Sequence, residues 1–158
     1  MAINFGKSFE RKFVKDWAKS FPKSFIFRLK DNTSEYRYNS ANPCDFICFV
    51  NGTLYLVELK TVHGSTFPLS NLSQYDQLLG YKDVPGLVAC VIIWYVDKDK
   101  VLVVPIQTIQ QLKNDNKKSV NINNIFNDYL VIDVPSKKKR VYLDSDYSVI
   151  ENLSERSI

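Results

Sequence analysis

Apolar residues recur along the chain with two different spacings, and each spacing predicts a type of secondary structure. Phe9, Phe13 and Trp17 recur every four residues, which predicts an amphipathic helix over residues 8–20. Residues 87–96 instead form a continuous apolar run rich in Val and Ile, which is typical of a strand buried on both faces. The chain is therefore expected to combine a surface helix with a central strand.

Shorter patterns predict the remaining elements. Ser70 or Asn71 is expected to cap a helix that carries Leu72, Tyr75 and Leu79 on its apolar side. Further elements are expected as strands over 25–30, 101–105 and, at a sheet edge, 130–143, as short helices over 106–112 and 122–129, and as loops over 31–43 and 61–68. This order of helices and strands predicts an α/β fold in which a mixed central sheet is flanked by helices.

The most informative segment is a predicted β-hairpin around Asn51 and Gly52, because its geometry can be obtained by counting. An Asn-Gly pair between two apolar runs is the strongest short-range signal for a two-residue hairpin turn, and such a turn fixes the register of the two strands. Counting outward from the turn brings Asp45 directly opposite Glu58. Lys60 lies two residues further and points to the same face of the sheet. Two carboxylates and a lysine are thus expected to converge.

This arrangement favours a metal site. Two carboxylates at neighbouring positions repel each other unless a cation lies between them or one of them takes a proton. Asp45 and Glu58 can hold Mg²⁺, which prefers oxygen ligands, and the backbone carbonyl of Leu59 can supply one more ligand. Lys60 can orient a nucleophile or stabilise negative charge that develops on a phosphate. The alternative is a salt-bridge cluster on an exposed sheet face, without a metal.

Composition narrows the class of protein. A chain of 158 residues with 45% hydrophobic and 24% charged residues fits a single globular domain over residues 1–158, with a core of about 5–134 and a C-terminal tail of about 135–158. The net charge of +4 favours a polyanionic partner only weakly. We expect a cytoplasmic protein and no membrane partner, because neither a membrane-spanning apolar run nor a signal-peptide pattern is present.

Three segments carry a family resemblance. They are Asp-Phe-Ile at 45–47, Glu-Leu-Lys-Thr at 58–61 and Ser-Thr-Phe-Pro-Leu-Ser-Asn at 65–71. They resemble the PD-(D/E)xK nuclease superfamily and, within it, the RecU type of Holliday junction resolvase found in Gram-positive bacteria and their phages. Similar short stretches at 5–10 and 118–120 extend the resemblance over roughly residues 5–125. One departure is that Pro43 lies two residues before the aspartate, where the superfamily often has proline directly before it.

The resemblance implies a restriction-endonuclease-like αβββαβ core and a homodimer. It also implies a Mg²⁺-dependent endonuclease, with Mn²⁺ as a substitute, that nicks two strands of a four-way (Holliday) junction in branched double-stranded DNA during recombination. Such an enzyme would act in the cytoplasm of a bacterial cell and could be encoded by a phage. RecU-like enzymes carry a long stalk before the catalytic aspartate, and residues 29–42 are too few for a full one, which puts junction selectivity in question more than cleavage.

Further site residues are suggested by the same resemblance. Gln77 would contact the scissile phosphate or its water, as in the Q-x-x-x-Y pattern of some related exonucleases, although a polar helix face is an equally good explanation. Glu10 is a candidate metal ligand, but an early glutamate also simply favours the helix dipole. We expect contacts with DNA from Lys7, Arg37, Tyr38, Thr66 and Gln74.

Two polar features have simpler explanations. The run Lys137 to Arg140 could bind phosphates, but it more often protects an exposed turn or edge strand from aggregation. His63 has no obvious partner in the sequence and is more often incidental, or a phosphate contact, than a catalytic base.

Two alternatives to junction resolution stay open. The first keeps the chemistry and changes the substrate, giving a restriction-like, nicking or end-processing deoxyribonuclease of the same superfamily. The second is a noncatalytic DNA-binding module on a nuclease fold, against which the intact set of Asp45, Glu58 and Lys60 argues.

Overall fold

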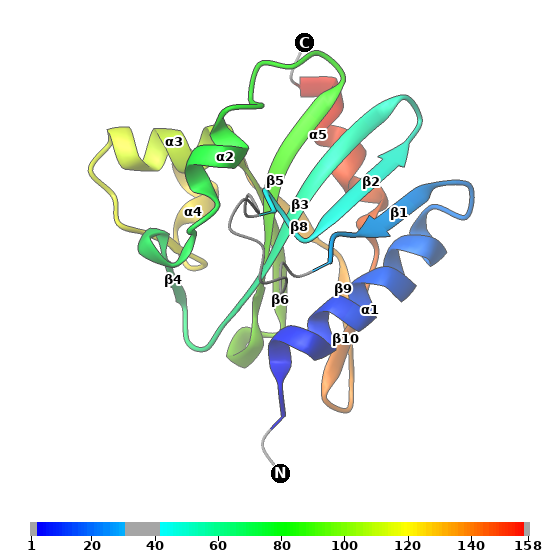
Figure 1. The fold of residues 1–158 in the computed structure, drawn as a ribbon. Coiled ribbons are helices and arrows are strands. Elements are labelled where there is room, and N and C mark those ends of the chain that lie inside the picture. Colours follow the sequence, from blue (N-terminus) through cyan, green and yellow to red (C-terminus); the bar gives the residue numbers. More distant parts are fainter. Residues whose placement is uncertain (1–2, 31–41, 157–158) are drawn as a thin grey trace, which may run out of the picture.

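A mixed six-stranded sheet forms the centre of the molecule, in a computed structural model that describes residues 3–30 and 42–156 (Figure 1). In spatial order its strands are β1 (Phe25–Arg28), β2 (Phe46–Val50), β3 (Thr53–Val62), β5 (Leu87–Tyr95), β6 (Lys100–Pro105) and β8 (Ile132–Val134). β3 and β5 are parallel, whereas the other neighbours are antiparallel. The predicted α/β class with a mixed central sheet is confirmed.

Helices cover the two faces of this sheet unequally (Figure 1). α1 (Phe5–Ser20) packs on one face through Phe9, Phe13 and Trp17, as their spacing predicts. The opposite face, called here the α2 face, is covered by α2 (Tyr75–Leu79), α3 (Ile106–Asn114) and α4 (Ile125–Asp128). β5 lies between the two layers and is buried on both faces, which confirms the prediction of a central strand. None of the helices in the described residues is both long and apolar enough to cross a membrane.

The segment after β3 is more regular than predicted. Residues 61–68 are expected as a loop, but β3 continues to Val62, and β4 (Thr66–Pro68) pairs with β7 (Ser119–Asn121) in a separate two-stranded sheet. This pairing joins segments about fifty residues apart, so no local pattern could reveal it. Phe67 and Val120 face each other in this pair and are both buried in the core on the α2 face.

The helix expected to begin at Ser70 or Asn71 is divided. A 3₁₀ turn occupies Leu69–Asn71, and α2 begins only at Tyr75, with Gln74 at the capping position and no side-chain cap. The N–H of Leu69 donates to the carbonyl of Lys118 at 2.9 Å, which ties the start of the segment to β7. The cap predicted at Ser70 or Asn71 is therefore wrong, because a long-range contact overrides the local signal.

The C-terminal segment completes the core on the α1 side of the sheet. After β8 the chain forms a hairpin of β9 (Ser136–Lys139) and β10 (Tyr142–Ser145), and then α5 (Glu151–Arg156). Leu143, Tyr147, Ile150 and Leu153 are buried in the same cluster as the apolar side of α1. Residues expected to form a tail thus contribute directly to the hydrophobic core.

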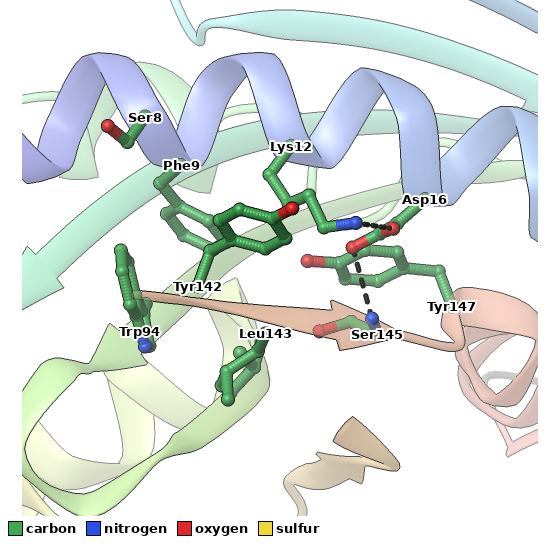
Figure 2. Close-up of a pocket in the computed structure, with 10 residues that line it drawn as sticks. Ser8, Phe9, Lys12, Asp16, Trp94, Tyr142, Leu143, Ser145 and Tyr147 are labelled. Carbon is green, nitrogen blue, oxygen red and sulfur yellow. Dashed lines mark hydrogen bonds and ion pairs between the residues drawn. The ribbon is translucent and has the colours of Figure 1, made fainter. Parts of the chain in front are cut away.

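A buried carboxylate fastens β10 to α1 (Figure 2). Asp16 is only 5% exposed, accepts a hydrogen bond from the N–H of Ser145 at 3.0 Å and forms an ion pair with Lys12 at 3.1 Å. Burial raises the pKa of Asp16 in spite of these partners. The adjoining cavity has a volume of about 10 Å³, enough for roughly one water molecule. This hollow therefore belongs to the packing of the core rather than to a ligand site.

Replacing Asp16 with alanine is expected to lower the free energy of unfolding by about 1 to 3 kcal/mol, because the buried N–H of Ser145 loses its acceptor. Urea denaturation monitored by circular dichroism measures the loss. Asp144→Ala is the matched control, because Asp144 also contacts Lys12 but is more exposed, and it should change stability much less. Equal losses in the two variants would contradict the role given to burial.

Candidate active site

The hairpin between β2 and β3 has the predicted register. Asn51 and Gly52 both have positive φ angles, 50° and 80°, as a two-residue turn of this kind requires. Val50 lies opposite Thr53, and the pairing continues without a slip as far as Phe46. Positions 47 and 49 of β2 therefore point to the α2 face, together with positions 56, 58 and 60 of β3.

Asp45 lies one residue before this regular ladder and is held by both neighbouring strands. Its carbonyl accepts from the N–H of Leu29 at 2.8 Å, and its own N–H donates to the carbonyl of Val57 at 3.0 Å. Its carboxylate accepts from the N–H of Leu59 at 2.8 Å. Asp45 thus contacts the residues on both sides of Glu58. The two carboxyl groups interact. The regular ladder, however, ends at Phe46 and Val57, so it does not include the directly opposed pair of Asp45 and Glu58 that counting predicts.

Glu58 is an ionisable group in a strongly unfavourable position. Its side chain is 3% exposed, and its Oε2 has no hydrogen-bond partner among the described residues. Burial, followed by the adjacent charge of Asp45, raises the pKa of Glu58 to about 9. Lys60 opposes this shift only partly, since its Nζ lies 3.8 Å from Oε1 of Glu58. Near neutral pH the pair therefore needs either a shared proton or a further cation.

The donor atoms at this pair fit a hard divalent cation. A buried carboxylate oxygen without a partner, next to a second carboxylate, supplies the oxygen ligands that Mg²⁺ prefers. Residues 3–30 and 42–156 contain no group of three or more His, Cys, Asp or Glu side chains arranged around a metal position. The remaining ligands would have to come from the backbone carbonyl of Leu59 and from water, which Mg²⁺ usually retains.

Glu10 lies close to the acid pair but is already engaged. It projects from α1, and one of its oxygens accepts from Nε of Arg28, at the end of β1, at 2.9 Å. Its negative charge contributes the smallest of the effects that raise the pKa of Glu58. Sequence reasoning did not single out Arg28, because the pairing of α1 with β1 across eighteen residues leaves no local signal.

The other predicted DNA contacts that the structure describes lie on or next to three elements, α1, β4 and α2. Gln77 is exposed on α2, and Gln74 directly precedes that helix. Thr66 is exposed on β4, opposite Asn121 of β7, and Lys7 is exposed in the first turn of α1. Arg37 and Tyr38 lie outside the described residues.

His63 does have a partner, which the sequence did not reveal. Its Nδ1 lies 3.2 Å from Oδ1 of Asp97, and the N–H of Gly64 donates to the other oxygen of that carboxylate at 2.7 Å. These hydrogen bonds lower the pKa of Asp97. Asp97 follows β5, which is parallel to β3, so two strand ends thirty-four residues apart meet at the same edge of the sheet.

Comparisons with known proteins identify a family and a fold. The family model described as Recombination protein U (RecU) matches residues 22–145, which is more than half of the chain. Among solved structures, the Holliday junction resolvase Hjc from the archaeal hyperthermophile Archaeoglobus fulgidus is similar with a TM-score of 0.54 and 20% sequence identity. The match covers 75% of this chain and 89% of the Hjc chain, and at this identity it supports the fold alone. No curated protein matches the chain.

Proposed function

The chain belongs to the Recombination protein U family of the PD-(D/E)xK superfamily, and we propose that it is a Mg²⁺-dependent endonuclease that resolves four-way DNA junctions. The observation that carries this proposal is the pair of Asp45 and the buried Glu58, with Lys60 beside it. The pair would be a costly way to build a core, since one oxygen of Glu58 has no partner. It is a suitable way to hold a cation next to a phosphate.

In this proposal Asp45, Glu58 and the carbonyl of Leu59 hold the metal. When bound, a divalent cation lowers the pKa of a coordinated water and shields the charge that grows on the phosphate. Lys60, whose side chain is 23% exposed, can orient the attacking water or stabilise that charge. The N–H of Leu59 donates a hydrogen bond to the carboxylate of Asp45. This bond holds the side chain of Asp45 against the backbone next to Glu58, so the two proposed carboxylate ligands are positioned before DNA binds.

The other sequence-based assignments belong to the same proposal. Gln77 would contact the scissile phosphate, Glu10 would be a further metal ligand, and Lys7, Thr66 and Gln74 would bind the DNA backbone. A homodimer would present two such sites to a substrate with near two-fold symmetry. We place the enzyme in the bacterial cytoplasm, with a phage as a possible source, and Mn²⁺ as a substitute for Mg²⁺.

A panel of DNA substrates tests this function. The protein with Mg²⁺ is expected to cut a synthetic four-way junction faster than a flap, a linear duplex or single-stranded DNA of the same sequence, and to be inactive in EDTA. Gel analysis of end-labelled strands measures the cuts. Preference for the linear duplex would instead support a restriction-like nuclease, and binding of the junction with no cutting at any metal concentration would support a noncatalytic module.

A further inference from the structure

Three phenylalanines form an exposed aromatic surface on the α2 face of β1 and β2. Phe25, Phe27 and Phe49 are 52%, 51% and 46% exposed. Phe25 lies opposite Phe49, and Phe27 lies opposite Ile47, so all four side chains share one face. The rings of Phe25 and Phe27 are nearly parallel, with an interplanar angle of 5° and centroids 6.3 Å apart. We call these three residues the phenylalanine surface.

This surface is continuous with the candidate active site. Asp45 directly precedes β2, which carries Ile47 and Phe49 on the α2 face. At the usual rise of a strand, Ile47 is about 7 Å and Phe49 about 13 Å from Asp45 along β2. A stacked strand of DNA advances about 3.4 Å per base, so this span corresponds to roughly two to four bases. Helices α2 to α4 pack against the other end of this sheet face, over β5 and β6.

We propose that the phenylalanine surface stacks against unpaired bases of the DNA next to the cleavage site; this rests on the proposed nuclease function. Phenyl rings offer a stacking surface but no hydrogen-bond donors or acceptors, so they hold bases of any sequence. A fully paired linear duplex buries its base faces in the stack, whereas a branch point whose bases are unstacked or unpaired exposes them. The surface would therefore favour branched over linear DNA without a long stalk.

A protein partner fits this surface less well. A second copy docked flat on it would lie within about 7 to 13 Å of Asp45, because that is the spacing along β2, and would close the approach to the acid pair. A nucleobase is thin enough to stack there and leave the approach open. Dimerisation through another surface, or through the edge of β1, leaves the phenylalanine surface free.

Binding measurements with the full chain in metal-free buffer test this inference. Phe27→Ala and Phe49→Ala are expected to weaken binding to a junction with two unpaired bases at the branch by about 5- to 100-fold each. Binding to linear duplex of equal length should not change. Phe126→Ala is the matched control, since Phe126 is 46% exposed on α4. Phe27→Trp should restore binding, because a larger ring still stacks.

A fluorescent base gives a second, direct readout. 2-Aminopurine at the unpaired positions should lose fluorescence on binding the wild type and the Phe126→Ala variant, and keep it with Phe27→Ala. The inference is overturned if Phe27→Ala and Phe49→Ala bind the junction as tightly as Phe126→Ala does, or if their affinity for linear duplex falls by the same factor. It is also overturned if light scattering shows that these variants change the oligomeric state, because the surface would then belong to the contact with a second copy. Failure of the proposed function looks different, since it would appear as a wild type that cuts no DNA with Mg²⁺.

Discussion

Asp45→Asn and Lys60→Ala variants are expected to bind a four-way junction with nearly unchanged affinity and to cut it at least about 100- to 1000-fold more slowly than the wild type. Asparagine keeps an oxygen that can accept the N–H of Leu59, so the hairpin should persist while the charge that holds the metal is lost. Removing Lys60 takes away the cation closest to Glu58. Single-turnover cleavage with labelled junction, alongside a binding titration in metal-free buffer, separates the two effects.

Matched controls exist on the same sheet. Lys100 and Asp133 form an exposed ion pair at 3.6 Å between β6 and β8, away from the hairpin. Lys100→Ala and Asp133→Asn change the same residue types and should cut at the wild-type rate. If Asp45→Asn or Lys60→Ala also cut at that rate, the assignment of the active site would be wrong even though the family membership stands.

In the absence of divalent metal, the free energy of unfolding should fall as the pH rises from about 5 towards 9, and the Glu58→Gln variant should lose most of this dependence. The pKa of Glu58 is raised to about 9 in the folded protein, from 4.5. Between these values the folded state keeps a proton that the unfolded state releases. Above the unfolded pKa of 4.5, Glu58 therefore lowers the free energy of unfolding. This loss of stability increases by up to about 1.4 kcal/mol for each pH unit.

Mg²⁺ should reverse this loss. A bound cation replaces the shared proton, so the metal is expected to raise the midpoint of thermal unfolding more at pH 8 than at pH 5. Glu58→Gln should be more stable than the wild type at pH 8 without metal, by roughly a few kcal/mol, yet gain little from Mg²⁺. Asp133→Asn serves as the control acid. An unchanged pH dependence in Glu58→Gln would show that the acid pair is not strained in solution.

The sequence was most informative about features that depend on residues close together in the chain. Asn51 and Gly52 adopt the positive φ angles that a two-residue turn needs, and this alone fixed which residues share a face with Glu58. The aromatic repeat of α1 and the apolar run of β5 were equally direct, because each follows from a period set by backbone geometry. The end of the ladder was less predictable, since Asp45 is displaced by hydrogen bonds to two strands at once.

Contacts between distant segments account for what could not be predicted. Arg28 beside Glu10, Asp97 beside His63 and Asp16 beneath Ser145 each join residues from separate elements. Their partners become visible only when the sheet is assembled, because side-chain pairing across a fold has no period in the sequence. The same limit explains the missed pairing of β4 with β7, which displaced the expected helix cap.

The docking of residues 143–153 on α1 also affects how the protein is made. α1 is synthesised more than a hundred residues before Leu143, Tyr147 and Leu153, which cover part of its apolar side. Contacts that span more than a hundred residues slow folding, because the intervening chain must be ordered first. During translation, α1 therefore keeps part of its apolar side uncovered until those late residues leave the ribosome. The protein therefore acquires its stable fold only after residues 143–153 have been added, so that a product terminated before them lacks part of its core.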